Sequence, residues 1–246
     1  MSTTIKLGIT ENGVRYHDFS KAPHILIAGE TGSGKSMMMH NIIAQAVLQY
    51  PNAAMVLIDP KYVEFRVYRN NSHLWCDIAN TADEAFQVLS MVLDEVQRRY
   101  KVLERTGARS GGDPLFVFID ELADLMYASR KETERLISRI AALGRACNVH
   151  LVVATQTPRA TVVSGLIKAN LGTRIALACA SAVDSRVIMD ENGAENLPRG
   201  GGYAWYKNGL DKEYFRGYYV PDSQIEERAR DSARKVSWWR RLFRRA

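Results

Sequence analysis

The sequence predicts an α/β fold in which a mostly parallel sheet is flanked by helices. Three short runs, continuously apolar at residues 54–58 and 115–119 and interrupted only by His150 at 149–154, are typical of strands that are buried on both faces, as in parallel sheets. Longer segments with helical spacing of apolar residues, at 35–49, 81–105 and 129–146, precede each of these runs in turn. With 246 residues, of which 46% are hydrophobic, the chain is long enough for one such domain with a sizeable core.

A fourth apolar run, residues 24–28, leads into the most informative stretch of the chain, Gly29-Glu30-Thr31-Gly32-Ser33-Gly34-Lys35-Ser36. This stretch has the G-x-x-x-x-G-K-[ST] spacing of a phosphate-binding loop, and it lies between a predicted strand and a predicted helix. Glycines let the backbone wrap a phosphate chain with its N–H groups pointing inward, and the positive end of the following helix strengthens that field.

We therefore expect residues 29–37, through Met37, to bind the phosphates of a nucleotide. Lys35 is expected to contact the β- and γ-phosphates, and the Ser36 hydroxyl to ligate Mg²⁺. Glu30 occupies a free position of the motif and is expected to point to solvent.

Two adjacent carboxylates, Asp120 and Glu121, end the apolar run at 115–119. Downstream of a phosphate loop this is the Walker B arrangement, in which Asp120 holds Mg²⁺, usually through water. Glu121 is then placed to polarise the water that attacks the γ-phosphate. The pair and the loop together predict hydrolysis of the nucleotide.

Polar residues also follow two other predicted strands, where open α/β sheets bind ligands. Asp59 and Lys61 follow residues 54–58 and indicate either a functional role or a surface turn. Thr155-Gln156 follows the run at 149–154, and Gln156 is a candidate sensor of the γ-phosphate that couples it to movement of neighbouring segments. The alternative for Gln156 is a residue that caps a turn.

The remaining segments complete the predicted organisation. Residues 1–22 form a short lead-in with a hairpin turn at Asn12-Gly13, residues 23–220 form the main domain, and residues 221–246 form a tail. Residues 106–113 form a glycine-rich loop that is either a DNA contact or a plain connector. Helices are expected at 162–169 and 183–189, a strand at 173–179, and a terminal hairpin from 203–206 and 214–220.

Charge is concentrated in the tail. Residues 226–246 carry eight Lys and Arg against three Asp and Glu, out of a net charge of +6 for the whole chain. The arginines and the apolar residues of 236–245 resemble a basic amphipathic segment for an anionic membrane surface, DNA or a partner groove, with a solvated end as the alternative. We expect no membrane-spanning helix, no secretory leader, and three free thiols, Cys76, Cys147 and Cys179, in a reducing cytoplasm.

With these motifs placed, residues ~5–206 resemble the motor domain of the FtsK/SpoIIIE family of DNA translocases, within the wider FtsK–HerA group. The stretches that carry the resemblance, in chain order, are Pro23-His24-Ile25-Leu26-Ile27-Ala28-Gly29, Ile58-Asp59-Pro60-Lys61, Ile119-Asp120-Glu121-Leu122-Ala123-Asp124-Leu125-Met126, Ala154-Thr155-Gln156, Gly165-Leu166-Ile167-Lys168-Ala169-Asn170 and Asp184-Ser185-Arg186-Val187-Ile188.

The resemblance implies a RecA-like core, a homo-oligomeric ring that is typically hexameric, and translocation of duplex DNA driven by ATP hydrolysis. It also implies an arginine supplied to each site by the neighbouring subunit. Arg145 is the first candidate by its position before the 149–154 strand, ahead of Arg186 and Arg174. The alternative for Arg145 is a surface charge at a helix end.

Three departures from the family are visible. Thr157 stands where the family usually has an arginine, so that Arg159 is a candidate replacement. We also expect no counterpart of the family's extra N-terminal subdomain with its membrane-spanning region, and none of its winged-helix module. We therefore expect a reduced motor with little intrinsic sequence specificity, whose DNA contacts come from the loops 61–75, 105–113 and 157–165. The alternatives are a packaging or conjugative pump guided by a partner protein, and a nucleotide-gated assembly without processive movement.

Overall fold

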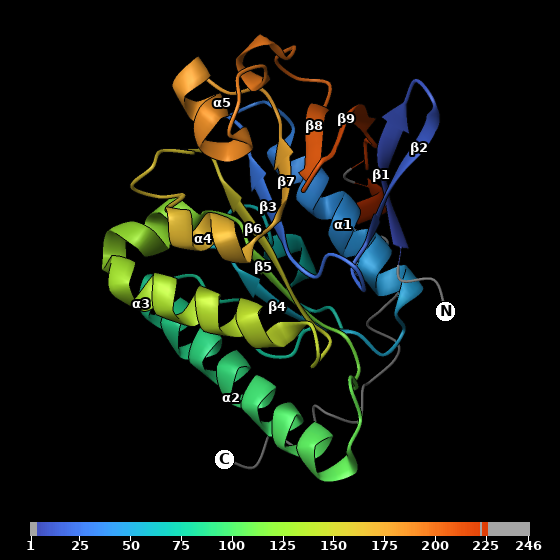
Figure 1. The fold of residues 1–246 in the computed structure, drawn as a ribbon, viewed down its shortest axis with the longest axis vertical. Helices are drawn as coiled ribbons and strands as arrows, with labels where there is room; N and C mark the ends of the chain where they lie inside the picture. Colours follow the sequence, from blue (N-terminus) through green and yellow to red (C-terminus); the bar gives the residue numbers. More distant parts are fainter. Residues whose placement is uncertain (1–3, 222, 226–246) are drawn as a thin grey trace.

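Five parallel strands form the centre of the fold in the computed structural model, which describes residues 4–221 and 223–225 (Figure 1). In spatial order they are β7 (Thr173–Ala176), β3 (Ile25–Ala28), β6 (Val149–Thr155), β5 (Leu115–Ile119) and β4 (Ala54–Ile58). All four pairings between these neighbours are parallel, so that the predicted α/β fold class is confirmed. β6 lies between β3, which precedes the phosphate loop, and β5, which precedes the carboxylates.

Antiparallel strands extend the sheet beyond β7. They are β8 (Tyr203–Asn208), β9 (Asp211–Gly217), β1 (Thr4–Thr10) and β2 (Gly13–Asp18), which bring the sheet to nine strands. The expected hairpin turn at Asn12-Gly13 joins β1 to β2, and β1 pairs with β9. Residues 4–18 are therefore part of the same sheet as the later strands; the division of the chain at residues 23 and 220 stays a prediction.

Helices cover both faces of this sheet (Figure 1). One face is covered by α1 (Lys35–Gln49), and the other by α2 (Ala82–Thr106), α3 (Leu122–Gly144), α4 (Gly165–Asn170) and α5 (Ala182–Met189). Short 3₁₀ turns lie at Arg66–Tyr68 and Ala194–Asn196. α2 agrees with its prediction because Thr81 and Glu84 form a capping box at its start and Gly107 adopts a left-handed conformation at its end.

The helix predicted at 129–146 begins seven residues earlier, at Leu122, and breaks at Ser129, whose φ and ψ are −158° and 97°. The Glu121 side chain accepts a hydrogen bond from the Ala123 amide and so starts the helix, a local role that the sequence analysis did not assign to it. The buried Thr133 hydroxyl spans the break, within hydrogen-bond distance of the carbonyl oxygens of Leu125 and Ser129. The unsatisfied backbone groups at this break are therefore partly served by a side chain.

Two further elements are shorter than predicted. β7 ends at Ala176 instead of residue 179, because the Cys179 amide bonds to the carbonyl of Ala194 in a 3₁₀ turn instead of to a strand. α4 begins at Gly165, three residues later than expected, after Ser164 accepts the Ile167 amide as a cap. In the C-terminal antiparallel pair, β8 continues to Asn208 and β9 runs from Asp211 to Gly217 instead of 214–220.

The core consists of two layers, because the side chains of each central strand alternate between the two faces. In β3, Leu26 and Ala28 face α2–α5 while Ile25 and Ile27 face α1, and all four are fully buried. Burial of each large apolar side chain stabilises the fold by about 1.5–3 kcal/mol. The ends of the strands are consequently held in fixed positions. We call the side of the sheet where β3–β6 end the carboxyl edge, and the side where they begin the amino edge.

Within the described part of the chain, no helix is both long and apolar enough to cross a membrane. The three cysteines are free thiols, of which Cys147 and Cys179 are buried and Cys76 is half-buried. Of the tail predicted at 221–246, residues 226–246, which include the basic amphipathic segment at 236–245, lie outside the described residues.

Candidate nucleotide-binding site

The phosphate loop connects the end of β3 to the start of α1 at the carboxyl edge, as predicted. Gly32 and Gly34 have φ values of +80° and +104°, a region that other residues rarely adopt, and this explains the glycines at these two positions. α1 begins at Lys35, so that the N–H groups of its first turn have no partner within the helix. The loop therefore presents backbone donors that suit a phosphate group.

A second glycine-rich segment, residues 199–202, approaches the phosphate loop closely. Gly200, Gly201 and Gly202 all have φ near +70° to +78°, and a Cβ at Gly34 would lie only 3.0 Å from the Cα of Gly202. The expectation that Glu30 points to solvent is wrong: its Oε1 lies 2.7 Å from the Nε of Arg199. Because the two segments are in contact, Arg199 of the second segment reaches Glu30, which occupies a variable position of the phosphate-loop motif.

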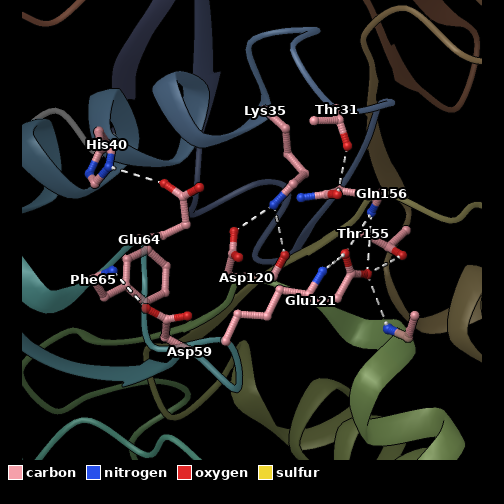
Figure 2. Close-up of polar contacts among 12 residues, drawn as sticks. Thr31, Lys35, His40, Asp59, Glu64, Phe65, Asp120, Glu121, Thr155 and Gln156 are labelled. Atoms are coloured by element: carbon pink, nitrogen blue, oxygen red, sulfur yellow. Dashed lines mark hydrogen bonds and ion pairs between the residues drawn. The ribbon is translucent and has the colours of Figure 1, made fainter.

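Lys35 and Asp120 form a buried ion pair at the centre of the site (Figure 2). The Lys35 Nζ donates to Asp120 Oδ1 at 2.5 Å and to the Asp120 carbonyl oxygen at 2.9 Å. Burial raises the pKa of the Asp120 carboxyl, and the charge of Lys35 opposes that rise. The two residues that the motifs predicted separately, as phosphate and Mg²⁺ ligands, are thus held together by one another.

Glu121 points in the opposite direction from Asp120, toward the end of β6 (Figure 2). Its Oε1 accepts from the Thr155 hydroxyl at 2.6 Å, from the Gln156 amide at 3.2 Å and from the Ala123 amide at 3.3 Å. Its Oε2 accepts from the same Gln156 amide at 3.1 Å and lies 3.5 Å from the Lys61 Nζ. The carboxylate is almost fully buried, and four groups from three segments fix it.

Gln156 links this carboxylate to the phosphate loop. Its side-chain Oε1 accepts from the Thr31 hydroxyl at 3.0 Å, while its backbone amide donates to Glu121. The contact exists because β6 lies between β3 and β5, so that the end of β6 faces both neighbouring loops. Gln156 thus contacts both the phosphate loop and the carboxylate, and its predicted role as a γ-phosphate sensor stays a prediction.

Asp59 and Lys61 follow β4 at the same edge and differ in exposure. Asp59 is buried; its Oδ2 accepts from the Phe65 amide at 2.9 Å, while its buried Oδ1 has no hydrogen-bond partner among the described residues. The Lys61 side chain is 45% exposed, with Nζ near Glu121. A surface turn therefore does not describe Asp59, whereas the ammonium of Lys61 lies on a half-exposed side chain that water can also reach.

Arg145 lies at the amino edge, at the end of α3, away from the phosphate loop of its own chain. Its exposed guanidinium makes no hydrogen bond or ion pair within residues 4–221. Together with Arg109 and Tyr100 it lines a cleft of about 450 Å³. By contrast, Arg174 bonds to Asp190 and the Ile188 carbonyl, and Arg186 bonds to the Asn192 side chain at 2.8 Å.

Sequence reasoning missed a cleft of about 470 Å³ that adjoins the phosphate loop on the α1 side. It is formed by Met37 and Met38 of α1, by the glycines 201 and 202, and by Arg216, Tyr218 and Tyr219 after and within β9. Its mainly apolar walls and its position next to the loop suit the planar base of a nucleotide. The available signal was the run Gly200-Gly201-Gly202, because three consecutive glycines indicate a close backbone approach.

Comparison with known proteins agrees with this geometry. Residues 1–114 and 112–160 match the profile of the FtsK/SpoIIIE family, which is more than half of the chain and includes the phosphate loop, Asp120, Glu121 and Gln156. The chain belongs to the FtsK/SpoIIIE family. The resemblance on which the sequence analysis relied is thereby confirmed.

FtsK/SpoIIIE relatives match most of this chain, which in turn spans about a third or less of their length. The DNA translocase FtsK of Streptococcus pneumoniae (strain ATCC BAA-255 / R6) is 38% identical, over 90% of this chain and 32% of its own. The DNA translocase SftA of Bacillus subtilis (strain 168) is 39% identical, over 92% of this chain and 26% of its own. The solved structure of the pCW3 conjugation coupling protein TcpA, a monomer form with ATPgS, superposes with a TM-score of 0.84 at 29% identity, over 94% of this chain and 70% of its own.

Proposed function

We propose that this chain is the ATP-hydrolysing motor of a translocase that moves double-stranded DNA. The observation that carries the proposal is the network at the carboxyl edge, in which Lys35 pairs with Asp120 while Gln156 joins Glu121 to the phosphate loop. A water-activating carboxylate next to a phosphate loop serves hydrolysis and has no use in binding alone. The relatives named DNA translocases support DNA as the substrate that is moved.

The bound species is ATP with Mg²⁺. Mg²⁺ takes one or two protein oxygens and completes its shell with water and phosphate oxygens, where it neutralises developing charge on the phosphates. The residues present fit this demand: Ser36 stands in the first turn of α1, Asp120 is buried at the end of β5, and the neighbouring Asp59 has a buried oxygen to which none of the described residues hydrogen-bonds. Lys35 would exchange its contact with Asp120 for the phosphates.

The site is completed by Arg145 of a neighbouring copy in a homo-oligomeric, hexameric ring. Arg145 is exposed, has no partner in its own chain among the described residues, and lies at the edge opposite its own phosphate loop, which suits a group that acts on another subunit. The loop 107–113 is bound to the same region, because the Gly111 amide donates to the Ala146 carbonyl at 3.1 Å. We therefore assign this loop to the subunit interface.

DNA contacts then come from the loops 61–75 and 157–165, which both leave from the carboxyl edge and include Lys61 and Arg159. Contacts to phosphates make binding nearly independent of sequence and strongly dependent on salt. Arg159 is exposed and stands two residues after Thr157, the position at which the family usually has an arginine.

A second candidate is a conjugative DNA pump whose specificity lies in a partner protein. The likeness to the conjugation coupling protein TcpA favours it over a packaging role. Its chemistry would be the same, so a stable complex with a DNA-processing partner protein would distinguish the two. A nucleotide-gated assembly without movement is disfavoured, because Glu121 is buried and oriented by four donors.

The test is the ATPase rate of the full chain with and without long linear duplex DNA, with Lys35→Ala as the matched control. We expect DNA to stimulate phosphate release by the unaltered chain, and Lys35→Ala to lose nucleotide binding and hydrolysis together. Absence of phosphate release in the presence of Mg²⁺, ATP and DNA would contradict the proposal. Mass in solution with a nucleotide analogue tests the ring in the same samples.

A further inference from the structure

We infer that Thr155 is a positioning residue for hydrolysis, which fixes Glu121 so that one carboxylate oxygen is left to accept the proton of the attacking water. The inference rests on the proposed function and adds to it a residue that lies outside the phosphate loop and the Asp120-Glu121 pair. Thr155 is the last residue of β6 and is fully buried. Its hydroxyl donates to Glu121 Oε1 at 2.6 Å, the shortest contact that the carboxylate makes (Figure 2).

The donors to Glu121 are divided unequally between its two oxygens. Oε1 is within hydrogen-bond distance of the Thr155 hydroxyl and of the Ala123 and Gln156 amides, which together use its lone pairs. Oε2 has the Gln156 amide at 3.1 Å and the Lys61 ammonium at 3.5 Å. Lys61 is half exposed and can be replaced by water, so that Oε2 is the oxygen with free capacity.

Thr155 is the one buried side-chain donor among these groups. The Ala123 and Gln156 amides belong to the backbone, and they bind whichever oxygen faces them. A hydroxyl on a stiff β-branched side chain selects one orientation of the carboxylate, since its own χ1 is restricted. Removal of this donor would let the carboxylate rotate between orientations of which only some serve water activation.

The position of Thr155 also connects the carboxylate to the phosphate loop. Its backbone carbonyl accepts from the Gly29 amide, at the start of that loop, at 3.3 Å, and its hydroxyl oxygen accepts from the Thr157 amide at 3.1 Å. One residue thus contacts the beginning of the nucleotide loop, the water-activating carboxylate and the segment that leaves toward the proposed DNA loop. Its effect should appear in turnover and not in nucleotide affinity, because neither of its side-chain contacts lies on the phosphate loop.

The experiment measures kcat and KM for ATP with long duplex DNA, and the dissociation constant of a fluorescent ATP analogue, for the full chain and three variants. Thr155→Val keeps the shape and removes the donor; we expect kcat to fall by about 10- to 100-fold, the size of a lost hydrogen bond to a charged group. Analogue affinity should stay within about twofold, since the phosphate contacts remain. Thr155→Ser restores the hydroxyl and should recover most of kcat. Thr173→Val is the control: it replaces another buried threonine, the first residue of β7, and so measures the effect on kcat of a buried threonine-to-valine substitution away from Glu121.

A double variant separates action through Glu121 from action elsewhere. If Thr155 works through this carboxylate, Thr155→Val combined with Glu121→Gln should be no slower than Glu121→Gln alone. Additive losses, an unchanged kcat in Thr155→Val, or a faster kcat would each overturn the inference while leaving the proposed function in place. If the unaltered chain itself releases no phosphate, the proposed function fails, and the inference fails with it.

Discussion

The amino and carboxyl edges of the same parallel strands bury polar side chains in different ways. At the amino edge, His24 accepts the Leu151 amide at Nδ1 and donates from Nε2 to the Ala141 carbonyl, each at 3.0 Å. At the carboxyl edge, Lys35 and Asp120 pair with one another, and Glu121 is bound by Thr155. The first arrangement uses a neutral ring and fixed backbone groups, and the second uses charged side chains.

The pKa shifts follow this difference. Burial lowers the pKa of His24 from 6.5 to about 4, although its contact with the Ala141 carbonyl opposes the shift, so the ring is neutral near pH 7. Burial raises the pKa of Asp120, against the charge of Lys35. A buried polar group whose partners are all backbone atoms keeps the same hydrogen bonds. A lysine paired with a carboxylate, by contrast, can exchange the carboxylate for a phosphate. The contrast gives a criterion for recognising a binding site: the carboxyl edge, to which we assign the nucleotide, is the one where buried charged side chains have partners that a ligand can replace.

The largest expected effect is an exception to this comparison, because it comes from a residue at the amino edge. Arg145→Ala should lower the DNA-stimulated ATPase rate by about 10³-fold, the scale for loss of an arginine that stabilises transition-state charge in trans. Arg139→Ala, an exposed arginine of the same helix, is the matched control and should keep the rate.

Mixing tests whether Arg145 acts on a neighbour. Arg145→Ala subunits keep an intact nucleotide site, and Lys35→Ala subunits keep the arginine, so mixed assemblies should recover part of the activity that each variant lacks. Mixtures that are as inactive as their components would contradict action in trans and would return Arg145 to the role of a surface charge.

Glu121→Gln sharpens the comparison at the carboxyl edge, with a loss of about 10²-fold or more in hydrolysis, as for removal of a general base. The amide oxygen of glutamine still accepts from Thr155 and from the Ala123 amide, so the start of α3 and the binding of ATP should persist. Steady-state rates measure the loss of hydrolysis, and titration of a fluorescent ATP analogue measures whether binding is retained. Loss of analogue binding would show that Glu121 is needed for the architecture of the site.

The fourth effect is on stability instead of activity, and it concerns the amino edge. The folded pKa of His24 lies below its unfolded value of 6.5, so the unfolded chain binds the proton first as the pH falls. The stabilisation is complete above about pH 6.5 and is lost as the pH falls toward 4, by up to about 3 kcal/mol in the free energy of unfolding. His24→Gln, which retains a donor and an acceptor without titrating, should flatten this dependence in urea unfolding between pH 7 and 4. An equally steep dependence in the variant would assign it to His17 and His150, whose pKa values burial also lowers.

The sequence predicted those elements that have a recognisable pattern within a short stretch of the chain. The phosphate loop, the apolar strands and the paired carboxylates each carry their own pattern, and the structure brings Lys35, Asp120, Glu121 and Gln156 to one edge. Contacts between distant segments have no such pattern. Arg199 beside Glu30, the hydroxyl of Thr155 on Glu121, and the early start of α3 depend on the order of strands in the sheet, with β6 placed between β3 and β5.

The placement of β6 has a consequence for a ring of the proposed kind. This strand starts just after Arg145, where a subunit would reach the nucleotide of its neighbour, and ends at Thr155, beside the nucleotide of its own. Its seven residues span roughly 23 Å, are buried along their whole length, and pair with β3 on one side and β5 on the other. In such a ring, β6 would directly connect the two nucleotide sites that one subunit contacts, so that a displacement of the strand at one site would be felt at the other.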